Sequence, residues 1–306
     1  MLSLSLWLRA GSPPPIEPLP PRIVALDVGQ GDALLVQGRR GVVLVDAGRS
    51  IPGRLDMGAR TVVPALAALG VGSLDLVIAS HADVDHRGGL DAVLRRVPVG
   101  RLWLPAGGLE DPAFAGLRAL ARERTVVVEE ILADGRPEQR AGDLSIEVLW
   151  PTEHATEASS NDGSIVVRVS VDGDAVLLTG DIGRSVERAL TASGRPIEAR
   201  ILKVAHHGSV TSSGGAFLDA VGASIAIVSA GCGARSGLPA SPVLDRLRER
   251  SIRVEWTGRD GAIVLPLGAA RSDEEARRFG TVRKGCERAA SRRAPASCVA
   301  HPSACQ

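Results

Sequence analysis

Short apolar runs, each closed by a glycine or a polar turn, recur from residue 23 to residue 267 and limit the folds open to this chain. The first three runs are separated by glycine-rich turns, which predicts a meander of strands. Strand-like runs then alternate with segments of helical spacing. A second stretch follows the same order without repeating the sequence, and it opens on a hairpin around Asp172 and Gly173. Such a chain buries its strands when two sheets pack face to face with helices outside.

The pattern gives explicit limits for the expected elements. Strands are predicted at residues 23–26, 33–36, 42–45, 74–79, 101–104, 126–132, 144–149, 165–171, 175–179, 200–204, 224–229, 252–256 and 262–265. Helices are predicted at residues 58–69, 88–96, 112–122, 183–191, 215–221 and 241–250.

The chain divides into three predicted parts. Residues 1–21 form an apolar leader and a proline-rich linker, and residues 22–268 form one α/β domain. Residues 269–306 are expected to be a disordered basic tail with a short helix at 273–279. The leader is too short to span a bilayer, so the chain is expected to lack a transmembrane segment of its own. Without a convincing export signal, the default expectation is a soluble, cytoplasmic protein.

Composition disfavours some modes of binding. The net charge of +1 gives the whole chain no strong attraction to nucleic acids or membranes. From Gly268 onward eight Arg and Lys stand against four Asp and Glu, so the remainder of the chain is mildly acidic. Aromatic residues make up 2% and tyrosine is absent, which argues against a surface that binds single strands by stacking bases on aromatic rings.

The sharpest local signal is the segment SHADVDHRGG at residues 80–89, which follows a buried strand and leads into a helix. Two His and two Asp fall within six residues of a loop that the strand holds in place. Alternate residues of an extended loop can point the same way. His81 and Asp83 are therefore expected to serve one metal ion, and Asp85 and His86 a second. The alternative is a polar strand-to-helix loop in which Asp85 caps the helix.

Three more strand ends carry residues of the ligand type. Asp181 follows a buried strand, where a carboxylate can bridge two cations or, alternatively, cap the next helix. His206 and His207 follow another strand, and one can bind a metal while its neighbour contacts substrate or orients a carboxylate. Asp46 follows a third strand and is expected to fix the metal loop by hydrogen bonds rather than to bind metal.

These segments together resemble the metallo-β-lactamase superfamily. The order of motifs carries the resemblance: DAG at 46–48, SHADVDHRGG at 80–89, TGD at 179–181 and HH at 206–207. LDVGQGDA at 26–33 and NDGS at 161–164 make the chain similar to the soluble domain at the end of ComEC proteins, which are membrane channels for DNA uptake. The resemblance covers residues 23–267. It implies a four-layer αββα sandwich with metals at one edge of the sheets, and a supporting role for Asp32 beside Asp46.

The chain departs from the superfamily pattern at two ligand positions. Asp83 stands where the metal loop usually has a second histidine. No histidine takes the place expected before the strand of Asp181; Asn161 lies in that region, and His154 is interpreted as a surface residue. Replacing imidazoles by oxygen ligands shifts the preference toward harder ions, Mn²⁺ or Mg²⁺ over Zn²⁺. The two divalent ions are expected to be Mn²⁺ or Zn²⁺, with Mg²⁺ as a further candidate.

The resemblance implies a metal-dependent phosphodiesterase, a nuclease acting on single-stranded DNA. Asp181 would bridge the ions, with His81, Asp83 and Asn161 at one and Asp85, His86 and His207 at the other. Either of the neighbours His206 and His207 can bind the metal, so His206 is also a ligand candidate. The residues expected to take part in catalysis are Asp85, His206, Lys203 and Ser209, the last three by stabilising the phosphoryl charge or the leaving oxygen.

Two alternatives stay open. A hydrolase of a small phosphodiester, thioester or lactone would use the same site, because one fold hosts many reactions. A non-catalytic DNA-guiding module with a vestigial metal site is the other. A basic rim formed by Arg87, Arg101, Arg235 and Arg259 would favour DNA. A role like that of the ComEC domain would imply a membrane channel as partner and a place at the outer face of the membrane.

Overall fold

Two mixed sheets of seven strands form the centre of the computed structural model, which describes residues 20–153, 159–232 and 237–268. In spatial order the first sheet contains β16 (Ile263–Pro266), β1 (Arg22–Ala25), β2 (Leu34–Gln37), β3 (Val42–Val45), β6 (Leu74–Ile78), β7 (Val99–Pro105) and β8 (Val127–Ile131). The second contains β15 (Arg253–Trp256), β14 (Ile225–Val228), β13 (Ile201–Lys203), β12 (Asp174–Leu178), β11 (Val166–Val171), β10 (Leu144–Trp150) and β9 (Gln139–Ala141).

Both sheets have the same pairing pattern. Antiparallel pairs join β16 through β3 in the first sheet and β9 through β12 in the second. Parallel pairs then join β3 through β8 and β12 through β15. Parallel strands that are joined by helices carry their binding residues at their carboxyl ends. In each sheet, a site can therefore form at the carboxyl ends of the parallel strands.

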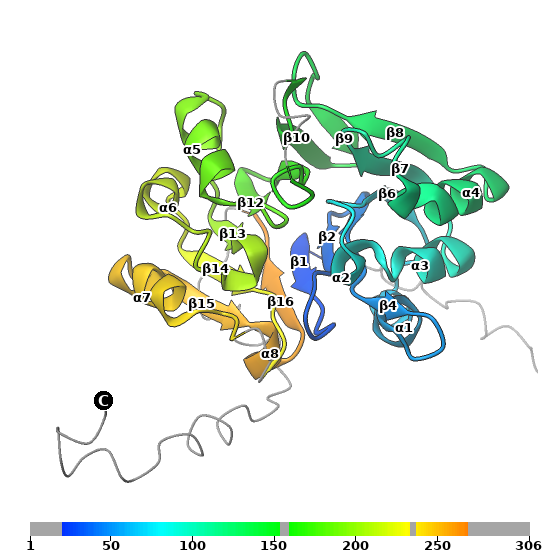
Figure 1. Ribbon diagram of the computed structural model, residues 1–306, viewed down its shortest axis with the longest axis horizontal. Coiled ribbons are helices and arrows are strands. Elements are labelled where there is room, and N and C mark those ends of the chain that lie inside the picture. The colour runs from blue at the N-terminus through cyan, green and yellow to red at the C-terminus, as the bar shows by residue number, and fades with distance from the viewer. Residues whose placement is uncertain (1–19, 154–158, 233–236, 269–306) are drawn as a thin grey trace, which may run out of the picture.

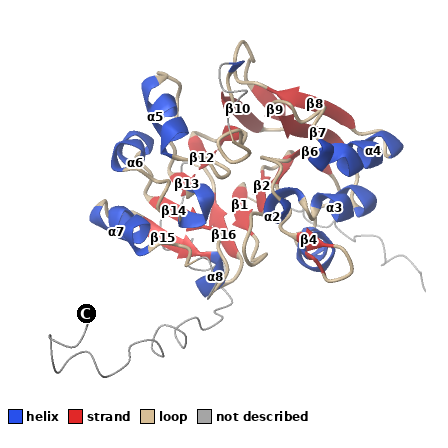
Figure 2. Ribbon diagram, viewed as in Figure 1, coloured by secondary structure: helices blue, strands red, loops and turns tan. Residues whose placement is uncertain are grey.

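Helices cover the two outer faces (Figures 1 and 2). On the first sheet lie α1 (Val63–Ala68), α3 (Leu90–Arg96) and α4 (Ala115–Glu123), and on the second lie α5 (Arg184–Ala192), α6 (Gly215–Val221) and α7 (Ser241–Glu249). Two single-turn helices, α2 (Val84–Arg87) and α8 (Thr257–Asp260), and a small hairpin of β4 (Ser50–Ile51) and β5 (Leu55–Asp56) lie in the connections. None of the described helices is long and apolar enough to cross a membrane.

Strand periodicity separates three buried layers of side chains. Ile23 of β1 and Ile201 of β13 belong to the core between the sheets. Their neighbours Val24 and Leu202 face the helices on the outer side of each sheet. Successive strand residues point to opposite faces, so a sheet buried on both sides needs continuous apolar runs. The predicted four-layer αββα sandwich is confirmed.

The predicted hairpin around Asp172 and Gly173 is present, with both residues at positive φ (52° and 77°). The structure also contains elements that the apolar pattern did not predict. The edge strand β9 was missed because its three residues show no apolar alternation. The turn α2 was missed because its four residues are too few for a period. The leader before residue 20, the tail helix at 273–279 and His154 lie outside the described residues, and the domain limits stay predictions.

We predict that Gly41→Ala lowers the free energy of unfolding by about 1–3 kcal/mol, because overpacking displaces a neighbour that cannot move away. A Cβ at Gly41 would lie 1.8 Å from the carbonyl oxygen of Ala141, where the turn after β2 meets β9 of the other sheet. Urea denaturation measures the change.

The matched control is Gly116→Ala in α4. No atom lies within 4 Å of the added Cβ. We expect this variant to gain about 0.5–1 kcal/mol from helix propensity. If the free energy of unfolding changed equally and in the same direction in both variants, the assigned contact between the sheets would be contradicted.

Candidate metal centre

The polar residues of the candidate site follow five strands whose carboxyl ends lie on the same side of the two sheets. Strands β3 and β6 are parallel neighbours, as are β12, β13 and β14. The residues that follow these five strands, in the same order, include Asp46, Ser80, Asp181, His207 and Ser229. Residues distant in sequence thus meet because parallel strands end at a common edge.

The carboxylate of Asp46 holds the metal loop in place. Its Oδ1 accepts a hydrogen bond from the backbone N of Ser80 at 2.8 Å. Its Oδ2 accepts from the Ser80 hydroxyl at 2.6 Å and from His86 Nδ1 at 2.8 Å. The Ser80 hydroxyl proton is thereby used, so its oxygen can accept from His81 Nδ1, which lies 3.0 Å away. Both imidazoles consequently carry their proton on Nδ1 and direct the lone pair of Nε2 into the site.

His207 reaches the same tautomer by a different contact. Its Nδ1 lies 2.7 Å from the carbonyl oxygen of Ser229, which can only accept a hydrogen bond. The turn that presents it has three successive residues at positive φ: His206 (50°), His207 (53°) and Gly208 (82°). The turn leaves His207 buried and His206 half-buried. A non-glycine residue in this conformation costs roughly 1–2 kcal/mol. His206 and His207 both adopt this conformation, so the folded chain carries the cost at two positions.

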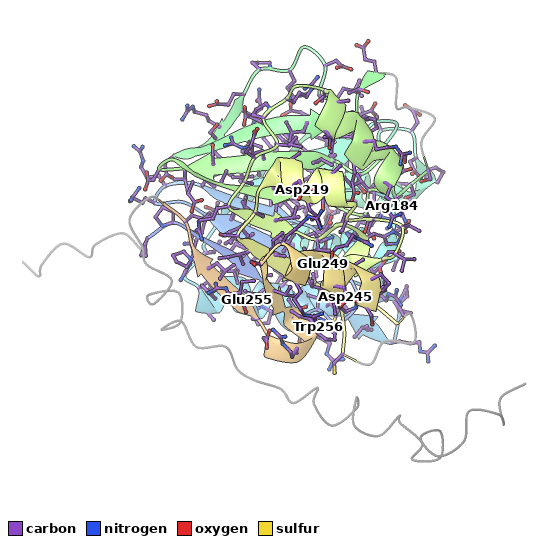
Figure 3. The ribbon with its side chains drawn as sticks, turned by 90° about the vertical axis from the view of Figure 1, so that its left-hand side faces the viewer. Arg184, Asp219, Asp245, Glu249, Glu255 and Trp256 are labelled. Carbon is purple, nitrogen blue, oxygen red and sulfur yellow. The ribbon has the colours of Figure 1, made fainter. Side chains whose placement is uncertain are left out.

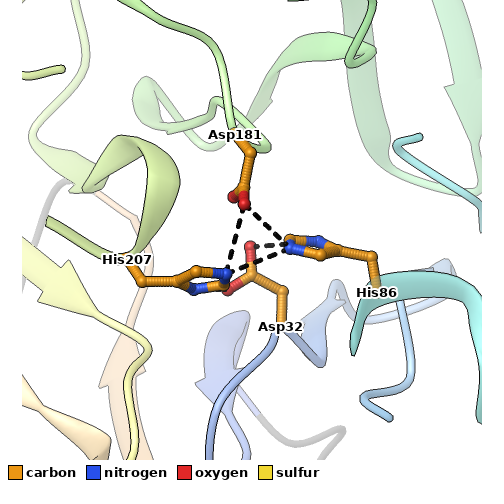
Figure 4. Close-up of side chains that lie close together, drawn as sticks. All are labelled: Asp32, His86, Asp181 and His207. Carbon is orange, nitrogen blue, oxygen red and sulfur yellow. Dashed lines mark hydrogen bonds and ion pairs between the residues drawn. The ribbon is translucent and has the colours of Figure 1, made fainter. Parts of the chain in front are cut away.

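Three acceptor atoms converge at the centre of the cluster (Figure 4). His86 Nε2 and His207 Nε2 lie 3.2 Å apart, and Asp181 Oδ2 lies 3.3 Å from the first and 3.2 Å from the second. Lone pairs at these distances repel unless positive charge lies between them. The spacing matches the edge of a tetrahedron whose corners lie about 2.0 Å from its centre, as in zinc sites. The three residues therefore fit a divalent cation.

The buried charges around this triangle do not cancel. Asp32, Asp46 and Asp181 are at most 4% exposed and face one ammonium, that of Lys203, which is 0% exposed. With neutral imidazoles, three carboxylates and one ammonium leave two negative charges. Buried charge is costly unless it is compensated. A divalent cation carries the charge that is missing.

The pKa shifts of the imidazoles report the same imbalance. Burial by itself would lower the pKa of His207, but the Asp181 carboxylate and hydrogen bonding to Asp181 and Asp32 raise it to about 9. Burial likewise opposes charge on His86, yet Asp181 and Asp46 raise its pKa well above the ordinary value. Positive charge is thus favoured at this point, and protons and a cation compete for it.

Asp32 and Lys203 lie beneath the triangle. Lys203 Nζ contacts Asp32 Oδ2 at 2.5 Å, Asp181 Oδ1 at 3.4 Å and the Gly180 carbonyl at 2.9 Å. Asp32 approaches His86 and His207 from the Nδ1 side, at 3.8 and 3.5 Å, whereas Asp181 faces Nε2. An oxygen of Asp32 still lies within 4.8 Å of the ligand atoms of the other three residues. Asp32 therefore lies where it can support the ligands, and Lys203 is held inside the protein.

Glycine makes this approach of Asp32 possible. Gly31 has φ +130°, and a Cβ there would lie 2.0 Å from the carbonyl oxygen of Asp85. The backbone N of Asp32 instead donates to that oxygen at 3.3 Å. Gly31 thus lets two loops pack in direct backbone contact beneath the site.

A second group lies beside the triangle. His81 Nε2 is buried without a hydrogen-bond partner among the described residues, and Asp83 Oδ2 lies 3.8 Å from it. The Ser160 hydroxyl donates to Asp83 Oδ1 at 3.0 Å, and Asn161 Nδ2 lies 3.5 Å from His206 Nε2. An unpartnered buried lone pair is rare in proteins, and a cation would satisfy it. This group fits a second ion.

Two predicted residues lie at the margin. Asp85 Oδ2 is 3.9 Å from His207 Nε2 and 3.5 Å from Arg49. Asp85 lies inside α2 and does not cap it. The hydroxyl of Ser209 contacts Thr211 at 2.9 Å and no predicted ligand. The structure thus brings His207 rather than His206 to Asp181, and it leaves Ser209 turned toward its own loop.

The serine partners of the ligands carry almost no signal in the sequence. Ser80, Ser160 and Ser229 orient ligands through a hydroxyl or a carbonyl, and serines occur throughout the chain. The position of Ser80, directly before His81 at a strand end, was the only available signal.

Within the described residues, Arg87, Arg101 and Arg259 do not form the basic rim that would have favoured DNA. Arg87 binds the carbonyl of Ala82 in the metal loop, while Arg101 lies near the amino end of β7 and binds the carbonyl of Arg140. Arg259 pairs with Asp260 on α8. Arg235 lies outside the described residues. These side chains take part in local contacts at different ends of the sheets.

A model of the metallo-beta-lactamase superfamily matches residues 26–231, which include the whole candidate centre. The chain belongs to this superfamily. The predicted resemblance is thereby confirmed, and this metallo-beta-lactamase domain is a metal-dependent hydrolase by family, with a candidate metal site at the expected edge of its sheets.

Two relatives of this metallo-beta-lactamase domain are competence proteins. It is 35% identical over 250 residues to ComE operon protein 3 of Bacillus subtilis, covering 78% of this chain and 32% of that protein. It is 33% identical over 247 residues to competence protein ComA of Neisseria gonorrhoeae, covering 80% and 32%. The chain thus spans about a third of the length of these relatives.

A solved structure shares the fold. The metallo-beta-lactamase fold protein YhfI from Bacillus subtilis superposes with a TM-score of 0.50 at 15% identity, over 77% of this chain and 96% of that one. At this identity the likeness concerns the fold alone.

We predict that Asp46→Asn weakens binding of Zn²⁺ and Mn²⁺ by about 10–100-fold, because residues that orient metal ligands contribute affinity of that order. The substituted amide cannot accept from Ser80 and His86 as the carboxylate does. Isothermal titration calorimetry measures the affinities. Asp172→Asn, in the exposed hairpin turn, is the control and should leave them unchanged. Equal affinities in all three proteins would refute the orienting role.

A double-mutant cycle tests the ion pair beneath the site. Lys203→Met removes the ammonium from between two buried carboxylates and should cost about 3–5 kcal/mol of stability in EDTA. Adding Asp32→Asn removes one of those charges, so the double variant should be more stable than the sum of the single effects by about 1–3 kcal/mol. Chemical denaturation gives the four free energies of unfolding. Strict additivity would contradict the coupling.

Proposed function

We propose that this chain is a metal-dependent phosphodiesterase that cleaves single-stranded DNA in the context of DNA uptake. One observation carries the chemical part of the proposal: His86 Nε2, His207 Nε2 and Asp181 Oδ2 lie 3.2–3.3 Å apart with their lone pairs directed at one point. His81 Nε2 beside them, which has no hydrogen-bond partner in the described part of the chain, supports a second ion. Two adjacent cations are the usual means of hydrolysing a phosphodiester.

The ligand roles follow from the contacts. His86, His207 and Asp181 would hold one ion, with Asp85 at its margin, and His81 and Asp83 would hold the other, with Asn161 in reach. Divalent ions bound there would supply Lewis-acid activation of water and charge that complements a phosphate. Mn²⁺ and Zn²⁺ are the proposed ions, since the ligands mix imidazoles with carboxylates.

The chain's own side chains would position the substrate. His206 is half-buried next to Asn161, and in this proposal it would hold a phosphate oxygen or the leaving oxygen. Lys203 is fully buried, so its part would be to keep Asp32 and Asp181 in place rather than to touch DNA. Ser209 is half-buried and would require rotation away from Thr211 to contact substrate.

The choice of DNA is supported by the relatives. Both are named for competence, and this chain matches about a third of each. By that analogy a membrane channel would be the partner, and the outer face of the membrane the place of action.

One observation favours a second candidate, a hydrolase of small substrates. The arginines proposed as a basic rim, Arg87, Arg101 and Arg259, are spread over local contacts instead of lining the centre. A polyanion usually binds a continuous basic surface. A small phosphodiester, thioester or lactone requires none.

We predict cleavage of labelled single-stranded DNA by the purified chain with added Mn²⁺, and its loss with EDTA. His81→Ala and Asp181→Ala should each lower the rate by at least roughly a hundredfold, since removing a ligand costs more than removing its supporting partner. Gel electrophoresis of the labelled strand measures the rate with Mn²⁺, Mg²⁺ or Zn²⁺.

Asp172→Asn is the control, because Asp172 lies in the exposed turn between β11 and β12 and pairs with Arg39, outside the metal centre. No cleavage with any ion, by protein that binds metal, would refute the nuclease proposal. Hydrolysis of bis(4-nitrophenyl) phosphate without DNA cleavage would favour the small-substrate hydrolase.

A further inference from the structure

A second pocket, of about 440 Å³, lies on the helical face that covers the second sheet. It is bounded by α5, the start of α6 and α7, and none of its lining residues belongs to the metal centre. The side chains that give it its character are Arg184, Arg188, Arg246, Ala192, Thr191 and Phe217. Figure 3 views this face directly, with Arg184 labelled at one side of it. The pocket combines three guanidinium groups with a wall whose accessible surface is mostly apolar.

The positive charge in the pocket is not compensated by ion pairs. Elsewhere on this face, Arg248 pairs with Asp245 at 2.5 Å and Arg250 with Asp219 at 2.7 Å. Both of these acidic residues are labelled in Figure 3. Arg184 and Arg188 are exposed, and within the described residues their guanidinium groups have neither an ion pair nor a hydrogen bond. Uncompensated arginines gathered in a concave site favour an anionic ligand.

The floor of the pocket is rigid. Arg246 donates to the carbonyl oxygens of Ser213 and Ser212 at 2.7 and 3.0 Å. Glu187, 1% exposed, accepts from the backbone N of Ser213 and, at 2.8 Å, from that of Gly214. The one carboxylate in the wall is thus occupied by backbone donors. Contacts of this kind preorganise the site before any ligand binds.

The pocket and the metal centre are joined by neighbouring stretches of the chain. Arg184 follows Asp181 by three residues, a separation of at most about 11 Å along an extended chain. Its backbone N donates to the carbonyl of Thr211 at 3.0 Å, and Ser212 Oγ donates to the carbonyl of Ala205 at 2.8 Å, just before His206. One loop, residues 205–214, therefore connects the two sites. A polynucleotide can span this distance within a few nucleotides.

We infer that this pocket binds a phosphate-bearing nucleotide of the same single strand whose scissile phosphate lies at the metal centre. The inference rests on the proposed function. Arg184 and Arg188 contact the phosphate, and the exposed wall of Ala192 and Ala216 contacts the sugar or base. In this arrangement, the positive charge that binds the DNA strand comes from a separate pocket next to the metal centre rather than from a basic rim around the centre.

The test compares Arg184→Ala/Arg188→Ala with the full-length wild-type chain. Fluorescence anisotropy with labelled oligo-dT of twelve nucleotides, in EDTA, reports binding without cleavage. We expect roughly tenfold weaker binding at 0.15 M salt, and a plot of log K against log salt less steep by about 1.4, the value for two lost phosphate contacts on a single strand. Arg184→Lys/Arg188→Lys should retain the slope.

The matched control is Arg96→Ala/Arg122→Ala, which removes the same charge from α3 and α4 on the opposite helical layer. Equal losses in the control and the pocket variant, or wild-type affinity and slope in the pocket variant, would overturn the inference. So would binding of dTMP that the pocket variant loses while its DNA affinity is unchanged. A selective loss of DNA binding in a chain that cleaves no DNA would support the pocket and refute the nuclease proposal.

Discussion

The candidate centre depends on the carboxylate of Asp46, which is 0% exposed and accepts three hydrogen bonds. Through Ser80 and His86 it joins the ends of β3 and β6, and it fixes the tautomers of His81 and His86. Without this carboxylate, no hydrogen bond would fix the tautomers of His81 and His86 that direct both Nε2 lone pairs to the same point. Geometry that is fixed before a ligand arrives is what makes such a cluster selective for a cation.

Charge balance extends the same principle to the whole site. Lys203 compensates one carboxylate, and the left-handed turn at His206 and His207 brings the His207 imidazole against Asp181. What stays uncompensated is negative and buried, and it lies where the ligand atoms converge. The arginine pocket beside α5 is the complementary feature, since its net charge is positive and the exposed guanidinium groups of Arg184 and Arg188 have no ion pair among the described residues. The two features adjoin through residues 205–214, which suits a substrate that carries repeated negative charge.

Much of the fold was predictable because its signals are local. The hairpin at Asp172 and Gly173 and most strands follow from turn residues and apolar runs. The short polar strand β9 was not predictable, because its pairing with β10 comes from its position at the sheet edge. In the site, His86, Asp181 and His207 were predicted as ligands because each follows a strand. Ser80, Ser229 and the Asp32–Lys203 pair required the packed structure, since no spacing relates residues that meet across two sheets.

The sequence by itself determined the layered architecture, the family and the set of residues able to bind metal, because periodicity and motifs are written in neighbouring residues. Only the tertiary structure decided how those residues are used. It turned His207 inward and left His206 half-buried, it buried Lys203 beneath the carboxylates, and it dispersed Arg87, Arg101 and Arg259 while gathering Arg184, Arg188 and Arg246. The physical reason is that burial, tautomer and charge compensation depend on partners that the chain brings together only when both sheets have formed.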